Sequence, residues 1–330
     1  MRFFLALLPV LFSTSLVFCQ DKDKVYTKEF HLEVDNDAIV PPSLDRYYTS
    51  GIRLFYRKVA SEKSFLSKIF NSKDSTKTKR KVLYSFMLGH QFYTPEGLEN
   101  SDVSLFDRPY AGWVYGGTGV NAFYGSRFRL AFDFDLGFTG PSTGVGDLQE
   151  WYHEVLNFPV PRGWDFQIQN AIVSNLKSEL NYVLLSKQDD GIELISNTSF
   201  QFGTLFNNIR QGATLRLINF KPIDKSIFYH SRLGEGLSKS LKKNKPPREV
   251  YLFYTYAYER VFHNSLIEGH IWGESSPHLE TTEPNIHHHR VGIAFGGVGV
   301  DWHFSVHRNS PETTEAEGQT YGTVEIIARF

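Results

Sequence analysis

Residues 127–138 read RFRLAFDFDLGF, and their alternation decides the fold class. Phenylalanine and leucine fill every second position from 128 to 138, whereas arginine and aspartate occupy positions 127, 129, 133 and 135 between them. A β-strand points successive side chains to opposite faces, so the segment has one apolar face and one charged face. Such a strand fits either a soluble β-sandwich or a membrane β-barrel.

Three further features favour the barrel. The alternating segments run to about ten residues or more, whereas sandwich strands average about five or six. Aromatic residues make up 15% of the chain and crowd the strands, as in VYLFYTYAYERVF (250–262), where interfacial girdles would need them. The last segment, YGTVEIIARF, alternates up to the terminal Phe330. This ending resembles the signal by which the barrel assembly machinery recognises outer-membrane proteins.

The alternation predicts an all-β fold, a transmembrane antiparallel β-barrel of about twelve strands with a short helix in an extracellular loop. The expected strands lie near 28–36, 47–59, 81–94, 110–122, 126–138, 164–187, 191–205, 209–220, 250–262, 266–273, 288–307 and 320–330. With both termini periplasmic, segments 37–46, 94–109 and 139–163 face outward. Residues 61–81 and 221–249 fit poorly, because periplasmic connections are normally short turns.

The N-terminus and the composition narrow the class of protein. Residues 1–20, MRFFLALLPVLFSTSLVFCQ, have the pattern of a secretory signal peptide, which leaves residues 21–330 as the barrel domain. The only cysteine is Cys19, so we expect no disulfide and no cysteine-based metal site. A net charge of −1 argues against a nucleic-acid partner, and we expect a monomer.

One outward segment, GPSTGVGDLQEWYHEVLNFPVPRGWD (140–165), reads as a helix rather than a strand. Gly146 and Asp147 can start the helix, and the prolines after Asn157 end it. Gln149 and His153 are four residues apart, so both side chains project from one helix face. Such a pair can hold a water molecule, although a single histidine is more often an ordinary packing residue.

Two other outward segments carry polar clusters. The first strand ends in Asp35, Asn36 and Asp37, the next strand begins near Thr49, and segment 94–109 contains Asp107 and Arg108. The topology brings these clusters to the rim that also receives the helix. A possible base, a carboxylate and an amide at one place form the beginning of a hydrolytic site. An Asx-rich turn is the simpler explanation of residues 35–37 taken alone.

Four stretches together resemble the lipid A 3'-O-deacylase (LpxR-type) family of outer-membrane proteins. They are DND…DRYYTSG, YTPEG…DRPYAGWVYGG, GPSTGVGDLQEWYHEVLNFPVPRGWDFQIQN and HRNSPETTEAEGQTYG, in the order found in the family. The resemblance covers essentially the whole chain after residue 20. It implies a twelve-stranded barrel in the bacterial outer membrane that removes the 3'-O-linked acyloxyacyl group of lipid A and requires calcium.

The resemblance also implies site residues. The family's Asn-Asp pair falls on Asn36 and Asp37, its hydroxyl residue on Thr49, its glutamine on Gln149 and its histidine on His153. Asp35 replaces a glutamate that is usual in the family. An acidic family position falls near Pro159, where Glu154 or Asp165 would have to substitute.

The expected chemistry is ester hydrolysis. A neutral imidazole suits the activation of water, so His153 is the expected base. Calcium held by oxygen ligands would stabilise the oxyanion, with Asp37 either binding the metal or orienting the imidazole. Asn36, Thr49 and Gln149 would position calcium, water or the ester.

Two arginines near the rim have two readings. Arg46 and Arg108 contact the phosphates of lipid A, or they pair locally with their sequence neighbours Asp45 and Asp107. The two other classes of function that remain open are a phospholipase-like esterase with a Ser-His-Asn arrangement and a non-enzymatic channel or adhesin.

Two further patterns are expected to be structural. His287, His288 and His289 are adjacent on a strand, so their side chains alternate between faces and cannot chelate one ion together. Gly296, Gly297 and Gly299 are expected inside a strand, where small residues ease barrel packing.

Overall fold

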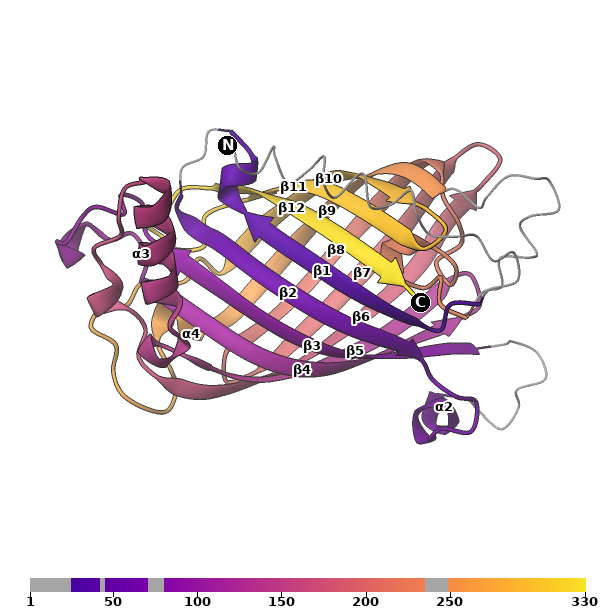
Figure 1. Ribbon diagram of the computed structural model, residues 1–330, viewed down its shortest axis with the longest axis horizontal. Helices are drawn as coiled ribbons and strands as arrows, with labels where there is room; N and C mark the ends of the chain where they lie inside the picture. The colour runs from indigo at the N-terminus through magenta and orange to yellow at the C-terminus, as the bar shows by residue number, and fades with distance from the viewer. Residues whose placement is uncertain (1–24, 42–44, 71–79, 235–248) are drawn as a thin grey trace.

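The structure is a computed structural model that describes residues 25–41, 45–70, 80–234 and 249–330. Within these residues twelve antiparallel strands form a closed barrel, in which each strand pairs with its sequence neighbours and β1 pairs with β12 (Figure 1). The predicted barrel of about twelve strands is therefore confirmed. No helix among the described residues is long and apolar enough to cross a membrane. The expected signal peptide, residues 1–20, lies outside the described residues.

The strands are long, as the alternation predicts. They are β1 (Lys28–Asn36), β2 (Tyr47–Val59), β3 (Arg80–Thr94), β4 (Ala111–Tyr124), β5 (Phe128–Thr139), β6 (Ala171–Lys187), β7 (Ile192–Gly203), β8 (Phe206–Asn219), β9 (Glu249–Asn264), β10 (Asn285–Gly296), β11 (Val300–Asn309) and β12 (Gln319–Arg329). The helices are α2 (Phe65–Phe70), α3 (Val145–Leu156) and α4 (Ser265–Glu268). Short 3-10 turns are η1 (Asp37–Ile39), η2 (Val103–Leu105), η3 (Pro141–Thr143), η4 (Trp164–Phe166) and η5 (Ile227–Tyr229).

The two faces of the strands separate a membrane barrel from a soluble sandwich. On β5, Phe134 and Leu136 lie exposed on the outside, whereas Arg129 is buried and its Nη1 lies 2.7 Å from Glu179 Oε2 of β6. Arg290 of β10 likewise contacts Glu325 of β12, with Nη2 and Oε1 at 2.8 Å. A soluble sandwich buries its apolar face and solvates its charges. This barrel does the reverse, as a protein surrounded by lipid must.

The expected strand at 266–273 is wrong. The chain forms α4 there, because the Asn264 side chain accepts a hydrogen bond from the Leu266 backbone at 3.0 Å and Glu268 accepts one from the Asn264 backbone at 3.1 Å. This reciprocal cap satisfies the free amides of a helix start and ends β9. The adjacent apolar residues Leu266 and Ile267 therefore belong to a buried turn of helix rather than to a strand.

The expected single strand at 288–307 is also wrong, because it is the hairpin of β10 and β11. The turn forms at Gly297, whose N–H donates to the Val300 carbonyl at 3.0 Å. A Cβ at position 297 would lie 2.6 Å from that carbonyl oxygen, so the turn needs glycine. Gly296 is the last residue of β10, as expected of a strand glycine, whereas Gly297 and Gly299 lie in the turn before β11. The two errors cancel, which leaves the strand count correct.

The barrel has a loop end and a terminal end. The connections that contain α3 and α4 lie at one end, and the C-terminus lies at the other (Figure 1). The described residues of segments 37–46, 94–109 and 139–163 belong to the loop end, as predicted, and residues 42–44 lie outside the described residues. Of the poorly fitting residues 61–81, the described part forms α2 beside β3 at the terminal end, and residues 71–79 lie outside the described residues.

Residues 220–234, named here the plug segment, explain why the connection between β8 and β9 is long. The segment enters the barrel: Lys81 Nζ donates to the carbonyls of Asp224 and Ser231 at 2.7 and 2.9 Å, and the Tyr229 hydroxyl donates to Asn197 at 3.1 Å. Partners on β3 and β7 place it inside the lumen at the terminal end. The strand count therefore stands, and residues 235–248 lie outside the described residues.

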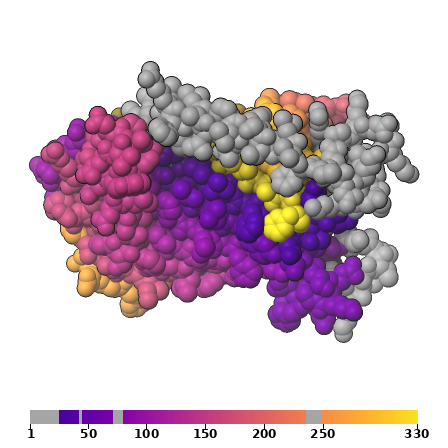
Figure 2. All heavy atoms as spheres, in the orientation of Figure 1, coloured from indigo at the N-terminus to yellow at the C-terminus, as the bar shows by residue number. Residues whose placement is uncertain are grey.

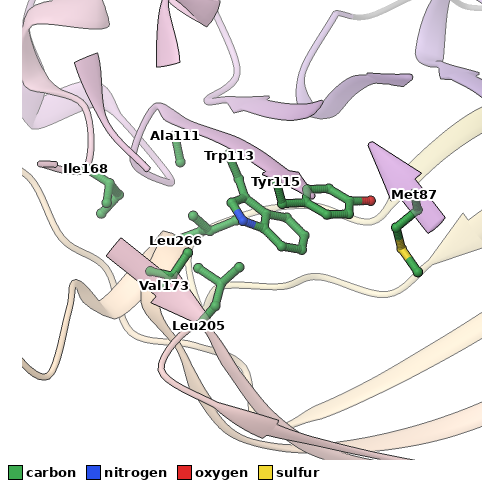
Figure 3. Close-up of a cluster of buried hydrophobic side chains, with 8 residues drawn as sticks. All are labelled: Met87, Ala111, Trp113, Tyr115, Ile168, Val173, Leu205 and Leu266. Carbon is green, nitrogen blue, oxygen red and sulfur yellow. The ribbon is translucent and has the colours of Figure 1, made fainter. Parts of the chain in front are cut away.

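An apolar cluster fills part of the lumen at the loop end. Figure 3 shows Leu266 of α4 beside Trp113 of β4, with Val173 and Leu205 below them. Trp113 stacks on Tyr115 with ring centroids 3.9 Å apart. The cluster anchors the loop-end connections on the barrel, which gives the rim a fixed frame.

Candidate active site

Helix α3 stands on the loop end of the barrel and confirms the helix predicted from the sequence (Figures 1 and 2). Gly144 precedes it and Asn157 follows it, both in the left-handed conformation, with φ of 66° and 58°. The Phe158 N–H donates to the His153 carbonyl at 2.8 Å, which closes the last turn. The helix therefore begins and ends at fixed points.

The helix turns its polar face toward the barrel. Gln149 and His153 are only 2% and 3% exposed, whereas Trp151 and Val155 are 59% and 62% exposed. Leu148 and Tyr152 belong to the same outer surface. A helix on a water-soluble protein would show the opposite arrangement. An apolar outer face beside a membrane barrel is suited to contact with lipid.

His153 is held at both ring nitrogens. Nδ1 lies 2.6 Å from the carbonyl oxygen of Pro159, and Nε2 lies 3.1 Å from Oδ2 of Asp45. Because a carbonyl can only accept, Nδ1 carries a hydrogen, and the Asp45 carboxylate favours a second proton on Nε2. Burial alone lowers the pKa of His153, but the hydrogen bonds to Asp45 and Pro159 and the charge of Asp45 outweigh burial and raise that pKa above its usual value.

Gln149 is oriented by Trp164. The Trp164 indole N–H donates to Gln149 Oε1 at 2.9 Å, and within the described residues Gln149 Nε2 has no hydrogen-bond partner. Gly146 makes this packing possible, because a Cβ at that position would lie 3.0 Å from the indole ring. The amide group is therefore fixed, with a donor left for a ligand or water.

Asp37 lies in η1, at the point where β1 ends. Its Oδ2 accepts a hydrogen bond from the Arg46 backbone N–H at 2.9 Å, and its side chain is buried. Burial first, and then the negative charge of Asp45, raise the pKa of Asp37 to about 8. Asn36 caps the same turn, with Oδ1 accepting from the Ala38 N–H at 2.8 Å. Asp37 and His153 are thus joined through residues 45 and 46.

Asp45 is a site residue that no sequence motif indicates in this role. From the sequence it is expected only as a local partner for Arg46, but its carboxylate contacts His153 of α3. Its backbone is left-handed, with φ of 46°, which turns the side chain away from the course of an extended chain. Aspartate tolerates that conformation better than most residues, but its direction could not be read from the sequence.

Thr49 lies apart from the histidine contacts. Its hydroxyl lies 2.7 Å from that of Thr94 on the neighbouring strand β3, and its side chain is buried. The structure therefore brings Asn36, Asp37, Gln149 and His153 to one rim. Thr49 lies level with the end of β1, because Asn36 pairs with Ser50, but its hydroxyl contacts β3 rather than α3.

The two arginines do not pair with their sequence neighbours, so that expectation is wrong. Arg46 contacts Glu96 at 2.6 Å and Glu317 at 3.0 Å, and Arg108 contacts Glu312 at 2.9 Å. These carboxylates belong to other loops. They meet the arginines only because closure of the barrel brings the loops together. Both guanidinium groups are buried, and in this arrangement they tie loops together.

The residues at the rim fit a hard divalent cation. Asp37 is a buried carboxyl group whose pKa is raised by burial and by a second carboxylate, Asp45, and the preceding residue, Asn36, carries an amide oxygen that accepts from the Ala38 N–H. Calcium prefers an all-oxygen donor set of this kind, and it would offset the repulsion between the two acids. Glu154 and Asp165, the two acids that would have to substitute at the acidic family position, are exposed. At that position the Pro159 carbonyl instead contacts His153.

Comparison with known proteins agrees with the fold and the motifs. Residues 3–330 match the family described as "Outer membrane protein LpxR". The solved structure of LpxR from Salmonella typhimurium has a TM-score of 0.69 and 20% identity, covering 92% of this chain and 100% of that chain. The β domain of the Bordetella autotransporter BrkA has a TM-score of 0.47 and 9% identity over 93% of this chain and 100% of that chain, a likeness too slight to carry an argument. No curated protein sequence matches the chain.

The family match covers nearly the whole chain, and the barrel, the helix and the order of the four motifs agree with it. The protein therefore belongs to the LpxR family of outer membrane proteins, the outer-membrane lipid A deacylases that its motifs resemble.

Proposed function

We propose that this protein hydrolyses the 3'-O-linked acyloxyacyl ester of lipid A, with His153 as the base that activates water and with calcium as cofactor. The observation that supports this most directly is the contact between the buried His153 and Asp45 on a helix whose other face is apolar. A lipid substrate in the outer leaflet can approach that apolar face. The polar face then meets the ester at the rim of the barrel.

Two groups, the Pro159 carbonyl and the Asp45 carboxylate, control the proton on His153. The Pro159 carbonyl keeps a hydrogen on Nδ1, so Nε2 is the nitrogen that accepts a proton from water. Asp45 holds a proton on Nε2 as long as its own charge is uncompensated. Once a cation neutralises the charge of Asp45, the second proton on Nε2 is no longer favoured, and the neutral imidazole of His153 can act as the base.

Asp37 and Asp45, with the Asn36 oxygen, are the residues that would hold calcium. The bound ion supplies positive charge that stabilises the oxyanion of ester hydrolysis. The free Nε2 donor of Gln149 is placed to orient the water or the ester. Arg46 and Arg108 hold the loops in place through Glu96, Glu317 and Glu312, and reach lipid phosphates only if those pairs open.

The other two functions have less support. A serine-dependent phospholipase needs a serine hydroxyl at the histidine, but in the described part of the chain the polar contacts of His153 are with Asp45 and Pro159. An open channel needs a clear lumen, whereas the plug segment occupies the terminal end. Recognition of Phe330 by the barrel assembly machinery, and the monomeric state, stay predictions.

Mass spectrometry of lipid A from cells that produce the protein tests the proposal. We expect the wild type to remove the 3'-O-linked acyloxyacyl group in calcium and to lose this activity in a chelator. His153→Gln should leave lipid A intact, while His287→Gln, a change on the outer face of β10, should behave as wild type. Cleavage of phospholipids instead of lipid A, or full activity of His153→Gln, would refute the assignment.

A further inference from the structure

A second group of histidines lies inside the barrel at the terminal end, away from α3. His31 of β1 and His303 of β11 flank Glu325 of β12, and all three point into the lumen because they occupy the charged face of their strands. His230 reaches the same place from the plug segment. Three imidazoles and one carboxylate therefore meet where the first and last strands close the barrel.

The distances converge on one oxygen. Glu325 Oε2 lies 3.5 Å from His31 Nε2, 3.8 Å from His230 Nε2 and 3.2 Å from His303 Nδ1. The rings of His31 and His230 are 4.5 Å apart at their centroids. His31, His230 and Glu325 each offer one ligand atom, and these three atoms lie within 4.8 Å of one another.

Hydrogen bonding leaves these histidines incompletely satisfied. His31 is 2% exposed and His303 is 3% exposed. Within the described residues neither ring nitrogen of His31 has a hydrogen-bond partner, and the same holds for His230 Nδ1 and His303 Nε2. Buried polar atoms are normally paired, and leaving one unpaired is destabilising. Another lumen histidine, His288, is satisfied by Glu259 at 2.7 Å and by Asn309 at 2.9 Å.

The donor set and its spacing suit a transition metal. Zinc binds imidazole nitrogen and carboxylate oxygen at about 2.0–2.2 Å, so two donors on a tetrahedral ion lie roughly 3.3 Å apart. The contacts of 3.5 and 3.8 Å from Glu325 are close to that spacing, and the three donor atoms, which lie within 4.8 Å of one another, would draw together around the ion. Arg290 holds the other oxygen, Oε1, at 2.8 Å, which fixes the carboxylate.

We propose that His31, His230 and Glu325 form a binding site for a divalent transition-metal ion of the zinc class, which ties the plug segment to the closing seam of the barrel. His303 is a positioning residue that holds Glu325, and water completes the coordination. The metal links three places that are far apart in sequence: β1, β12 and the β8–β9 connection. It would therefore stabilise the closed, plugged barrel.

Zinc titration of the folded full-length protein in detergent tests this, with calcium in excess to saturate the rim. We expect about one zinc ion per chain for the wild type, measured by elemental analysis after dialysis, and a rise in the unfolding temperature. The double variant His31→Gln/His230→Gln should lose both, and His303→Gln should weaken zinc binding about tenfold without loss of stoichiometry. The matched control His288→Gln should bind zinc as the wild type does.

Folding of each variant is checked by its heat-modifiable mobility on a gel. Cobalt in place of zinc should give the visible absorption bands of a four-coordinate nitrogen and oxygen site in the wild type and not in the double variant. Equal zinc content in the wild type and the folded double variant would overturn the proposal. The test is independent of deacylation, so its failure would leave the proposed function untouched.

Discussion

His153 and His31 are both buried histidines near a carboxylate, but their ring nitrogens have different hydrogen-bond partners. His153, at the loop end, has an acceptor at each nitrogen, Pro159 on one side and Asp45 on the other. His31, at the terminal end, has no hydrogen-bond partner at either nitrogen within the described residues, and it lies beside a second histidine and Glu325. Acceptors on both sides hold protons on an imidazole, whereas unpaired lone pairs around one carboxylate favour a metal ion.

The comparison is tested most strongly by removing the rim histidine. General base catalysis contributes about 10²–10⁴-fold, so His153→Gln should lower the rate of lipid A deacylation by about that factor. Mass spectrometry of the products over time measures it. The variant should still bind zinc in the lumen, which separates the two histidine sites. Loss of both properties together would mean that the substitution disturbs the fold.

The second largest effect is expected at Asp37, the acid at the end of β1, in the pH dependence of calcium binding. Without metal, burial and Asp45 raise the pKa of Asp37 to about 8, so its carboxyl group is protonated below that pH and must release a proton to bind calcium. Calcium affinity should therefore rise about tenfold per pH unit up to about 8 and then level off. Calorimetric titration of calcium at several pH values measures this.

Asp37→Asn should weaken calcium binding and remove most of its dependence on pH, since the titrating group is gone. The exposed acid Asp165 provides the control, because Asp165→Asn should keep the wild-type profile. An unchanged pH profile in Asp37→Asn would place the calcium elsewhere.

Replacing Asp45 tests the comparison directly, because it removes the carboxylate that contacts His153 Nε2. Burial lowers the pKa of His153 while Asp45 and Pro159 raise it, so Asp45→Asn should lower that pKa. Because the base must be neutral, the acidic side of the pH–rate profile should move to lower pH in whatever activity remains. Titration of the histidine ring followed by nuclear magnetic resonance reads the pKa directly. A pKa that stays in place would show that Asp45 does not control the proton.

The smallest effect is expected at the residue that orients Gln149. Trp164→Phe removes the indole N–H that Gln149 Oε1 accepts, and a hydrogen bond of this kind contributes about 0.5–1.5 kcal/mol. Deacylation should fall by about two- to tenfold, with zinc binding unchanged. Trp151→Phe, the same substitution on the exposed face of α3, is the matched control and should keep more activity. Equal losses in both would point to a general effect on the helix.

Much of the barrel could be predicted from alternation, and the failures have a physical cause. Residues 127–138 alternate without interruption, so β5 was found almost to the residue. Residues 266–273 do not alternate in this way, and the capping side chains of Asn264 and Glu268 make residues 265–268 the helix α4. The hairpin at Gly297 was missed because glycine suits both a crowded strand and a tight turn, and only the approach of Val300 decides between them.

The amino-acid sequence by itself determined the membrane barrel, the family and the helix face that carries Gln149 and His153. These depend on periodicity and on motifs, which are local properties of the chain. Only the tertiary structure decided that Asp45 contacts His153, that Arg46 and Arg108 pair across loops, and that His230 enters the lumen beside His31 and Glu325. These contacts join residues far apart in sequence, and they depend on barrel closure and on the backbone of irregular loops, which no local pattern encodes.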